Sequence, residues 1–202
     1  MALVKYNNNS ISAITTAGQL ASGSLVPISE QTASGSASIS FTTGIDSTYP
    51  IYKFEYNSLH PSTDGVYLQF NLSTDGGSNY NVTKTSASFH AFHNESDTVT
   101  SLSYDTVGDL AQSTGNQYIS NNIGNDNDQT VSGTLFLFNP SSTTFVKHYI
   151  SNTNASHQSE YTINTYVAGY GNTTSSINAI KFIMTSGNID AGTIKLYGIK
   201  DS

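Results

Sequence analysis

The sequence predicts an all-β protein, an antiparallel β-sandwich of jelly-roll-like type with about ten strands and an extended N-terminal arm. Apolar and polar side chains alternate with the two-residue period of strands, most clearly over residues 66–72. Clusters of Gly, Asn, Asp, Ser and Pro interrupt the alternation about every 8 to 15 residues. No stretch carries the period of a long helix, so short strands joined by turns favour a sandwich.

The C-terminal run, residues 176–199, shows the same alternation twice. Ile180, Phe182 and Met184 share one face of a first strand, and Ile194 and Leu196 share one face of a second. The polar turn over residues 186–192 separates them. We therefore predict a hairpin that closes the sheet.

The other predicted strands are bounded by similar turns. The sequence Ser-Thr-Asp-Gly occurs at 62–65 and again at 73–76, and an Asp-Gly pair readily supplies the positive φ of a tight turn. The strands are expected from residue 25 onward, within 37–41, 52–56, 66–72, 80–92, 117–121, 131–138, 144–150 and 161–170.

Two segments depart from this pattern. Residues 1–23 have weak periodicity, and we interpret them as an arm for attachment or oligomer contact, with a frayed terminus as the alternative. Residues 24–202 then form a single domain. Residues 94–116 are acidic and poor in apolar side chains, which indicates a long excursion with one short helical turn at 107–112. Loops of that length are often functional.

Composition excludes several classes of protein. The net charge is −7 and all seven cations are Lys, so the basic stripe of a nucleic-acid-binding protein is absent. No apolar run is long enough to insert into a membrane. The chain has no Cys, which excludes thiol catalysis and thiolate metal sites. The opening residues lack the apolar region of a secretion signal, and release with a virus particle fits this combination.

The sequence offers no catalytic motif, and we predict that the protein is not an enzyme. It lacks the Gly-x-Ser-x-Gly elbow of a serine hydrolase. Trp is absent and only four Glu are present, although glycosidases need paired carboxylates beside a sugar-stacking surface. No cofactor is expected.

The loop at 125–128 is the one candidate metal site. Asp126 and Asp128 place hard oxygen ligands close together, which suits Ca²⁺. The alternative is a solvated turn stabilised by its own side chains.

Tyrosines and loop amides are the remaining candidates. Tyr104 and Tyr118, with Asn125 and Asn127, could stack on and hydrogen-bond a sugar or form a protein interface. The alternative is that these tyrosines only fill the sheet, since Tyr favours strands.

Several stretches together resemble an uncharacterised family of virion proteins from marine tailed bacteriophages. They include Asp-Ser-Thr-Tyr-Pro-Ile-Tyr-Lys-Phe-Glu at 46–55 and the two Ser-Thr-Asp-Gly turns, and they extend over 1–11, 60–65, 73–80, 124–129, 138–148 and 186–198. The resemblance covers nearly the whole chain and carries no catalytic motif. It implies a component of the particle surface.

We therefore expect a non-enzymatic virion structural protein on the particle exterior, a tail or fibre component that contacts the host surface. A capsid decoration protein that stabilises the head is the first alternative. A carbohydrate-binding or polysaccharide-degrading module is the second. The expected partners are other virion proteins bound through the arm, further copies of the chain in a homo-oligomer such as a trimer, and a host-surface glycan.

Overall fold

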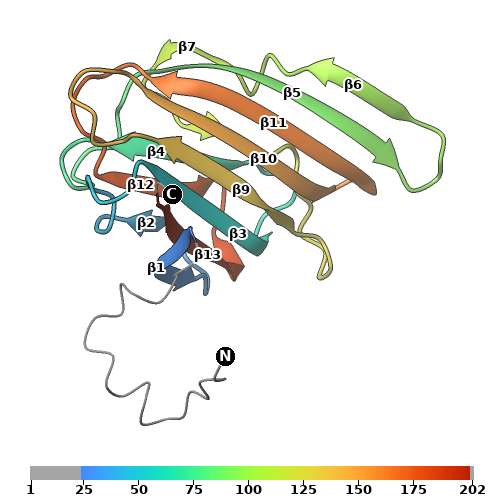
Figure 1. Cartoon of the computed structure of the whole chain (residues 1–202). Helices are drawn as coiled ribbons and strands as arrows, with labels where there is room; N and C mark the ends of the chain where they lie inside the picture. Colours follow the sequence, from blue (N-terminus) through green and yellow to red (C-terminus); the bar gives the residue numbers. More distant parts are fainter. Residues whose placement is uncertain (1–23, 201–202) are drawn as a thin grey trace, which may run out of the picture.

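Alternating side chains do form strands along this chain (Figure 1). The computed structural model describes residues 24–200, which contain thirteen strands and no helix. The predicted all-β antiparallel sandwich is confirmed, whereas its jelly-roll strand order stays a prediction. The arm predicted at residues 1–23 lies outside the described residues. Within residues 24–200 there is accordingly no helix with the length and apolar character to cross a membrane.

The estimate of about ten strands was too low. Two strands were not predicted: β6 and β7, which are five and four residues long and have few apolar side chains. The strands predicted within 37–41 and 117–121 exist as the shorter β2 and β8. The excursion at 94–116 contains β6 and β7, and the predicted helical turn at 107–112 is wrong because β7 begins at Leu110. Both strands hydrogen-bond to β5, which supplies the partner that the local sequence does not specify.

A large antiparallel sheet of nine strands forms one layer. Its order is β1-β13-β3-β9-β10-β11-β5-β6, with β7 also paired to β5. The bounds are β1 Leu25–Thr32, β13 Ile189–Ile199, β3 Ile51–Pro61, β9 Val131–Phe138, β10 Lys147–His157, β11 Tyr161–Gly171, β5 Lys84–Asn94, β6 Thr100–Tyr104 and β7 Leu110–Ser113.

A small sheet of four strands, in the order β2-β12-β4-β8, forms the second layer. Its strands are β2 Ile39–Phe41, β12 Ala179–Met184, β4 Leu68–Ser73 and β8 Gln117–Tyr118. All six residues of β4 are buried, as expected for a strand with one face in the core and the other under a loop. Figure 1 shows the large sheet extending beyond the small one at the end that carries β5, β6 and β11.

The predicted C-terminal hairpin is wrong, although both of its strands exist. β12 pairs with β2 and β4 in the small sheet, whereas β13 pairs with β1 and β3 in the large sheet. The turn therefore carries the chain from one layer to the other. Each strand buries one face in the same core, so their alternation is identical to that of a hairpin and cannot identify the pairing partner.

The two Ser-Thr-Asp-Gly turns are formed as predicted. Gly65 and Gly76 adopt φ values of 67° and 72°, in the left-handed region that a side chain with a Cβ disfavours. These turns bound β4 and fix its inward and outward faces.

Aromatic rings from both sheets form the centre of the core. Phe182 of the small sheet lies 5.5 Å from Phe54 and 6.0 Å from Tyr56 of the large sheet, measured between ring centroids. Buried tyrosines keep their hydroxyls satisfied: Tyr149 donates to Gln117 Oε1 at 2.8 Å, and Tyr56 donates to the Thr134 carbonyl at 3.0 Å. The layers are thus joined by apolar packing and by a few buried hydrogen bonds.

Candidate functional site

The loop at 124–129 closes into a turn at the end of the sandwich. The Gln129 N–H donates to the Asp126 carbonyl at 2.8 Å, and Gln129 Oε1 accepts from the Asp126 N–H at 3.2 Å. The same carbonyl lies 3.2 Å from His60 Nε2, and Asn125 Nδ2 lies 3.5 Å from the Ser62 carbonyl. Backbone and amide contacts therefore determine the shape of this loop.

The carboxylates of this loop are not arranged as a metal-binding site in the structure. Asp126 and Asp128, like Asn127, are exposed. Across residues 24–200, no three His, Asp or Glu side chains form a group that could hold a metal ion. The Ca²⁺ site at Asp126 and Asp128 stays a prediction without support from the side-chain geometry.

Asp128 instead lines a polar pocket, which we call the end pocket. It has a volume of about 400 Å³ and lies where β5 ends, β10 ends and β11 begins. Two hairpin turns meet at its wall, because the Glu95 N–H donates to the Glu160 carbonyl at 3.0 Å. The lining residues are His93, Asn94, Glu95, Asp128, Gln129, Ser156, His157, Glu160, Tyr161 and Thr162.

Gln129 is the buried polar residue of the end pocket. It is 5% exposed, and its Nε2 makes two long contacts of 3.5 Å, to the His157 carbonyl and to Glu160 Oε1. Gly124 allows this placement, since a Cβ at position 124 would collide with the Gln129 amide. Bonds at 3.5 Å are weak, so this amide retains hydrogen-bonding capacity toward the pocket.

Stacked rings form the apolar side of the end pocket. Tyr161 stacks between Phe92, at 5.4 Å, and His157, at 5.1 Å. His157 Nδ1 accepts the Ser159 N–H at 3.0 Å, and burial lowers the pKa of His157 below its usual value. His157 is therefore neutral at pH 7 and carries its proton on Nε2.

Tyr104 belongs to a different surface, on the outer face of the large sheet. Phe89 of β5 is directly opposite Tyr104 on one side and Tyr166 on the other, and the Phe89 and Tyr166 rings stack at 5.0 Å. Leu102 on β6 and Ile150 on β10 point to the same face. We call Phe89, Leu102, Tyr104, Ile150 and Tyr166 the outer patch; Leu102 is 72% exposed and Tyr104 is 56% exposed.

Tyr118 does not join either surface. It lies on β8 of the small sheet, where its ring contacts that of Tyr67 at 5.0 Å. The sequence therefore grouped residues that the fold separates: Asp128 in the end pocket, Tyr104 on the outer patch and Tyr118 on the other layer.

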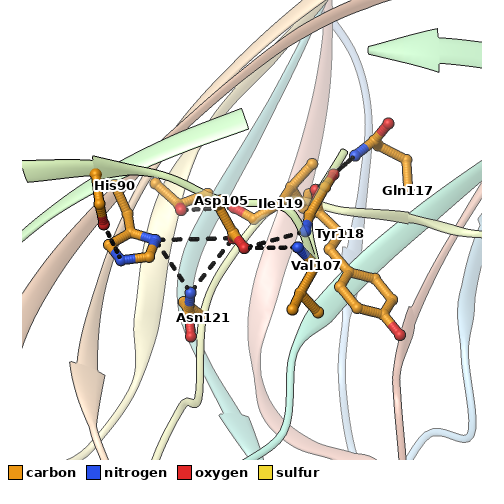
Figure 2. A network of polar contacts seen from close by, with 10 residues as sticks. His90, Asp105, Val107, Gln117, Tyr118, Ile119 and Asn121 are labelled. Atoms are coloured by element: carbon orange, nitrogen blue, oxygen red, sulfur yellow. Dashed lines mark hydrogen bonds and ion pairs between the residues drawn. The ribbon is translucent and has the colours of Figure 1, made fainter. Parts of the chain in front are cut away.

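A network of buried polar side chains connects the segment 94–116 to the rest of the sandwich (Figure 2). Asp105 Oδ1 accepts the N–H groups of Val107 and Gly108, at 3.0 and 3.2 Å. Its Oδ2 lies 3.4 Å from Asn121 Nδ2 and 3.7 Å from His90 Nδ1. Asp105 thus shapes the turn between β6 and β7 and connects it to the segment after β8.

The same network has the residue types of a catalytic triad without its geometry. Ser103 Oγ lies 3.1 Å from His90 Nε2, but the 3.7 Å between His90 Nδ1 and Asp105 exceeds hydrogen-bonding distance. Asn121 Nδ2 also faces His90 Nδ1, at 3.3 Å. We interpret the network as structural.

Sequence reasoning missed most residues of both surfaces. His90 and His93 are three residues apart on β5 and lie on opposite faces, with His90 in the buried network and His93 exposed at the end pocket. Nothing local in the sequence indicates that the turn at 158–160 adjoins the loop at 124–129. Their contact follows from the pairing of β10 with β9 and β11.

Comparison with known proteins gives no relative: no family model matches the chain, and neither a curated protein nor a solved structure matches it.

Proposed function

We propose that this chain is a non-enzymatic structural protein on the exterior of a bacteriophage particle, a tail or fibre component that contacts the host surface. The resemblance of its sequence to phage virion proteins motivates the setting. The observation that carries the structural role is the outer patch, which exposes five large apolar side chains on one sheet face. Contiguous exposed apolar surface of this kind is typical of protein interfaces.

The occupant that we propose for the outer patch is a second copy of the chain. The chain carries a net charge of −7, so two copies repel each other over most of their surfaces. The five side chains of the outer patch are uncharged, and the Asp109 carboxylate beside them is held by the Tyr104 hydroxyl at 2.8 Å. The stacked rings of Phe89 and Tyr166 hold each other in place and offer exposed aromatic surface that can pack against a similar sheet face.

The strand order supports a division of roles between the two edges of the large sheet. β1, which begins at Leu25, is one edge, and β6 is the other. An arm that attaches to the particle at the β1 edge leaves the β5–β6 edge, with the outer patch and the end pocket, directed away from the attachment point. This arrangement favours a protein that contacts the host surface over one that is enclosed within the particle.

Counting the copies in particles of the phage that encodes this chain tests the proposal. We expect a small number of copies, located on the tail by cryo-electron microscopy or antibody labelling. Hundreds of copies on the head would instead establish the decoration protein, and absence of the chain from purified particles would overturn both.

A further inference from the structure

We propose that the end pocket binds an uncharged, hydroxyl-rich glycan, a short stretch of a neutral polysaccharide. The inference rests on the proposed function only in naming the host surface as the source of the glycan. Binding itself is a property of the isolated chain and can be measured without the particle.

The size and position of the end pocket suit such a ligand. Its volume of about 400 Å³ falls within the range of roughly 300 to 1,000 Å³ that is typical of small-molecule sites. It lies among the turns that join strands at one end of the sandwich, where binding residues are commonly held by a rigid scaffold. The Glu95 to Glu160 backbone hydrogen bond fixes two of these turns to each other.

The hydrogen-bonding groups of the end pocket match the hydroxyls of a sugar. Glu160 and Asp128 are exposed carboxylates that accept hydrogen bonds from hydroxyl groups. The Gln129 amide is buried and makes only long contacts through its Nε2, so a ligand oxygen at normal distance would improve its hydrogen bonding. Ser156 and Thr162 add hydroxyls that both donate and accept.

The rings form an apolar wall of the end pocket, and a ligand meets Tyr161 at its edge because Phe92 and His157 cover its faces. Tyr161 is held between Phe92 and His157, so its orientation is fixed before a ligand arrives and little side-chain entropy is lost on binding. The neutral His157 ring extends this surface and offers its Nε2–H as a donor.

The charges of the end pocket select against acidic glycans. Three carboxylates line it, those of Glu95, Asp128 and Glu160, and no Lys is among the lining residues. His157 is neutral at pH 7 for the reason given above. A uronate or sulfate group would meet like charge at close range, which costs binding energy, whereas neutral hydroxyls form hydrogen bonds with the same carboxylates.

Saturation-transfer NMR and calorimetry on the full chain test this inference. The probes are neutral gluco-, galacto- and manno-oligosaccharides, with oligogalacturonate as the anionic probe. We expect at least one neutral probe to bind, with its signals transferred from the Tyr161 ring, and oligogalacturonate not to bind. Binding of none of the neutral probes, or equal binding of oligogalacturonate, would overturn the inference.

Variants then locate the site. Asp128→Asn and Glu160→Gln keep the side-chain shape, and we expect each to weaken binding of the neutral probe about tenfold, the usual effect of losing a charge-assisted hydrogen bond. Gly124→Ala displaces the Gln129 amide and should weaken binding as well. Glu30→Gln on β1, at the opposite edge of the sheet, is the matched control and should bind as wild type.

The outcomes separate the two proposals. Binding that survives Asp128→Asn, Glu160→Gln and Gly124→Ala alike would overturn the end pocket as the site, with thermal unfolding confirming that each variant is folded. Particle location is decided by the copy count and does not depend on these titrations.

Discussion

Lys84 Nζ lies 2.6 Å from Asn71 Oδ1, so a lysine side chain from the large sheet is buried against an amide of the small sheet. Its other acceptor is the Val82 carbonyl at 2.8 Å. Among residues 24–200, Lys84 makes no ion pair, and burial lowers the pKa of Lys84 to about 7. The sandwich therefore contains an amine that is charged or neutral depending on pH near neutrality.

This amine makes the stability of the fold pH-dependent. The pKa of Lys84 is about 7 in the folded chain, against 10.5 for the unfolded reference, so between these values the unfolded chain binds more protons. The free energy of unfolding therefore rises as the pH increases above about 7, and it stays at its lower value at pH values below about 7. We expect the free energy of unfolding to increase by about 2 kcal/mol between pH 7 and pH 9 in urea titrations.

Lys84→Met removes the titrating group and should abolish most of this slope, while making the fold more stable at pH 7. Lys181→Met on β12 of the small sheet is the matched control and should retain the wild-type slope. An identical slope in wild type and Lys84→Met would show that Lys84 is not the group that titrates.

The outer patch can be tested with one substitution at its most exposed residue. Leu102→Asp puts a charge where two copies are proposed to meet, so we expect the oligomer to dissociate in sedimentation or light-scattering measurements. Because Leu102 is 72% exposed, the free energy of unfolding of the single chain should change by less than about 0.5 kcal/mol.

The control for the outer patch is Phe145→Asp, at a side chain that is 67% exposed in the turn between β9 and β10. It should leave the oligomer intact. A wild-type chain that is monomeric at all concentrations, or dissociation by both substitutions, would contradict the proposed interface.

Asp105 should determine the order of the segment between β6 and β7. Asp105→Ala leaves the N–H groups of Val107 and Gly108 without their acceptor. We expect a loss of about 1 to 3 kcal/mol and faster amide hydrogen exchange at these two positions. Asp97→Ala, whose side chain is 90% exposed, should leave exchange at these positions unchanged; equal protection in the Asp105 variant would show that the network is dispensable.

Phe182 should contribute more to stability than any exposed aromatic residue. It is fully buried and contacts rings from both sheets, so Phe182→Ala creates a cavity where the layers meet. The expected loss is about 3 to 5 kcal/mol, measured by urea unfolding. Phe145→Ala serves as the exposed comparison and should change stability by less than about 0.5 kcal/mol.

The sequence by itself determined the local structure of this protein. Alternation along β4 and β12, together with the Asp-Gly turns at Gly65 and Gly76, follows from sterics and burial within a few residues, so the all-β class could be predicted with most of its strands. Tertiary structure alone decided which strands pair. β12 and β13 have the same alternation yet lie in different sheets, and β6 and β7 lie in a segment whose polar sequence predicted a loop.

The candidate surfaces depended on the same undetermined pairing. Asp128 was recognised for its chemistry, but Gln129, Glu160 and Tyr161 meet it only because β10 pairs with both β9 and β11. Tyr104 was recognised as a single tyrosine, but the outer patch exists only because β6 pairs with β5 and places Leu102 and Tyr104 beside Phe89. The chemistry of a side chain can be recognised from the sequence. The distances between the side chains of a site depend on which strands pair, and the local sequence does not specify that pairing.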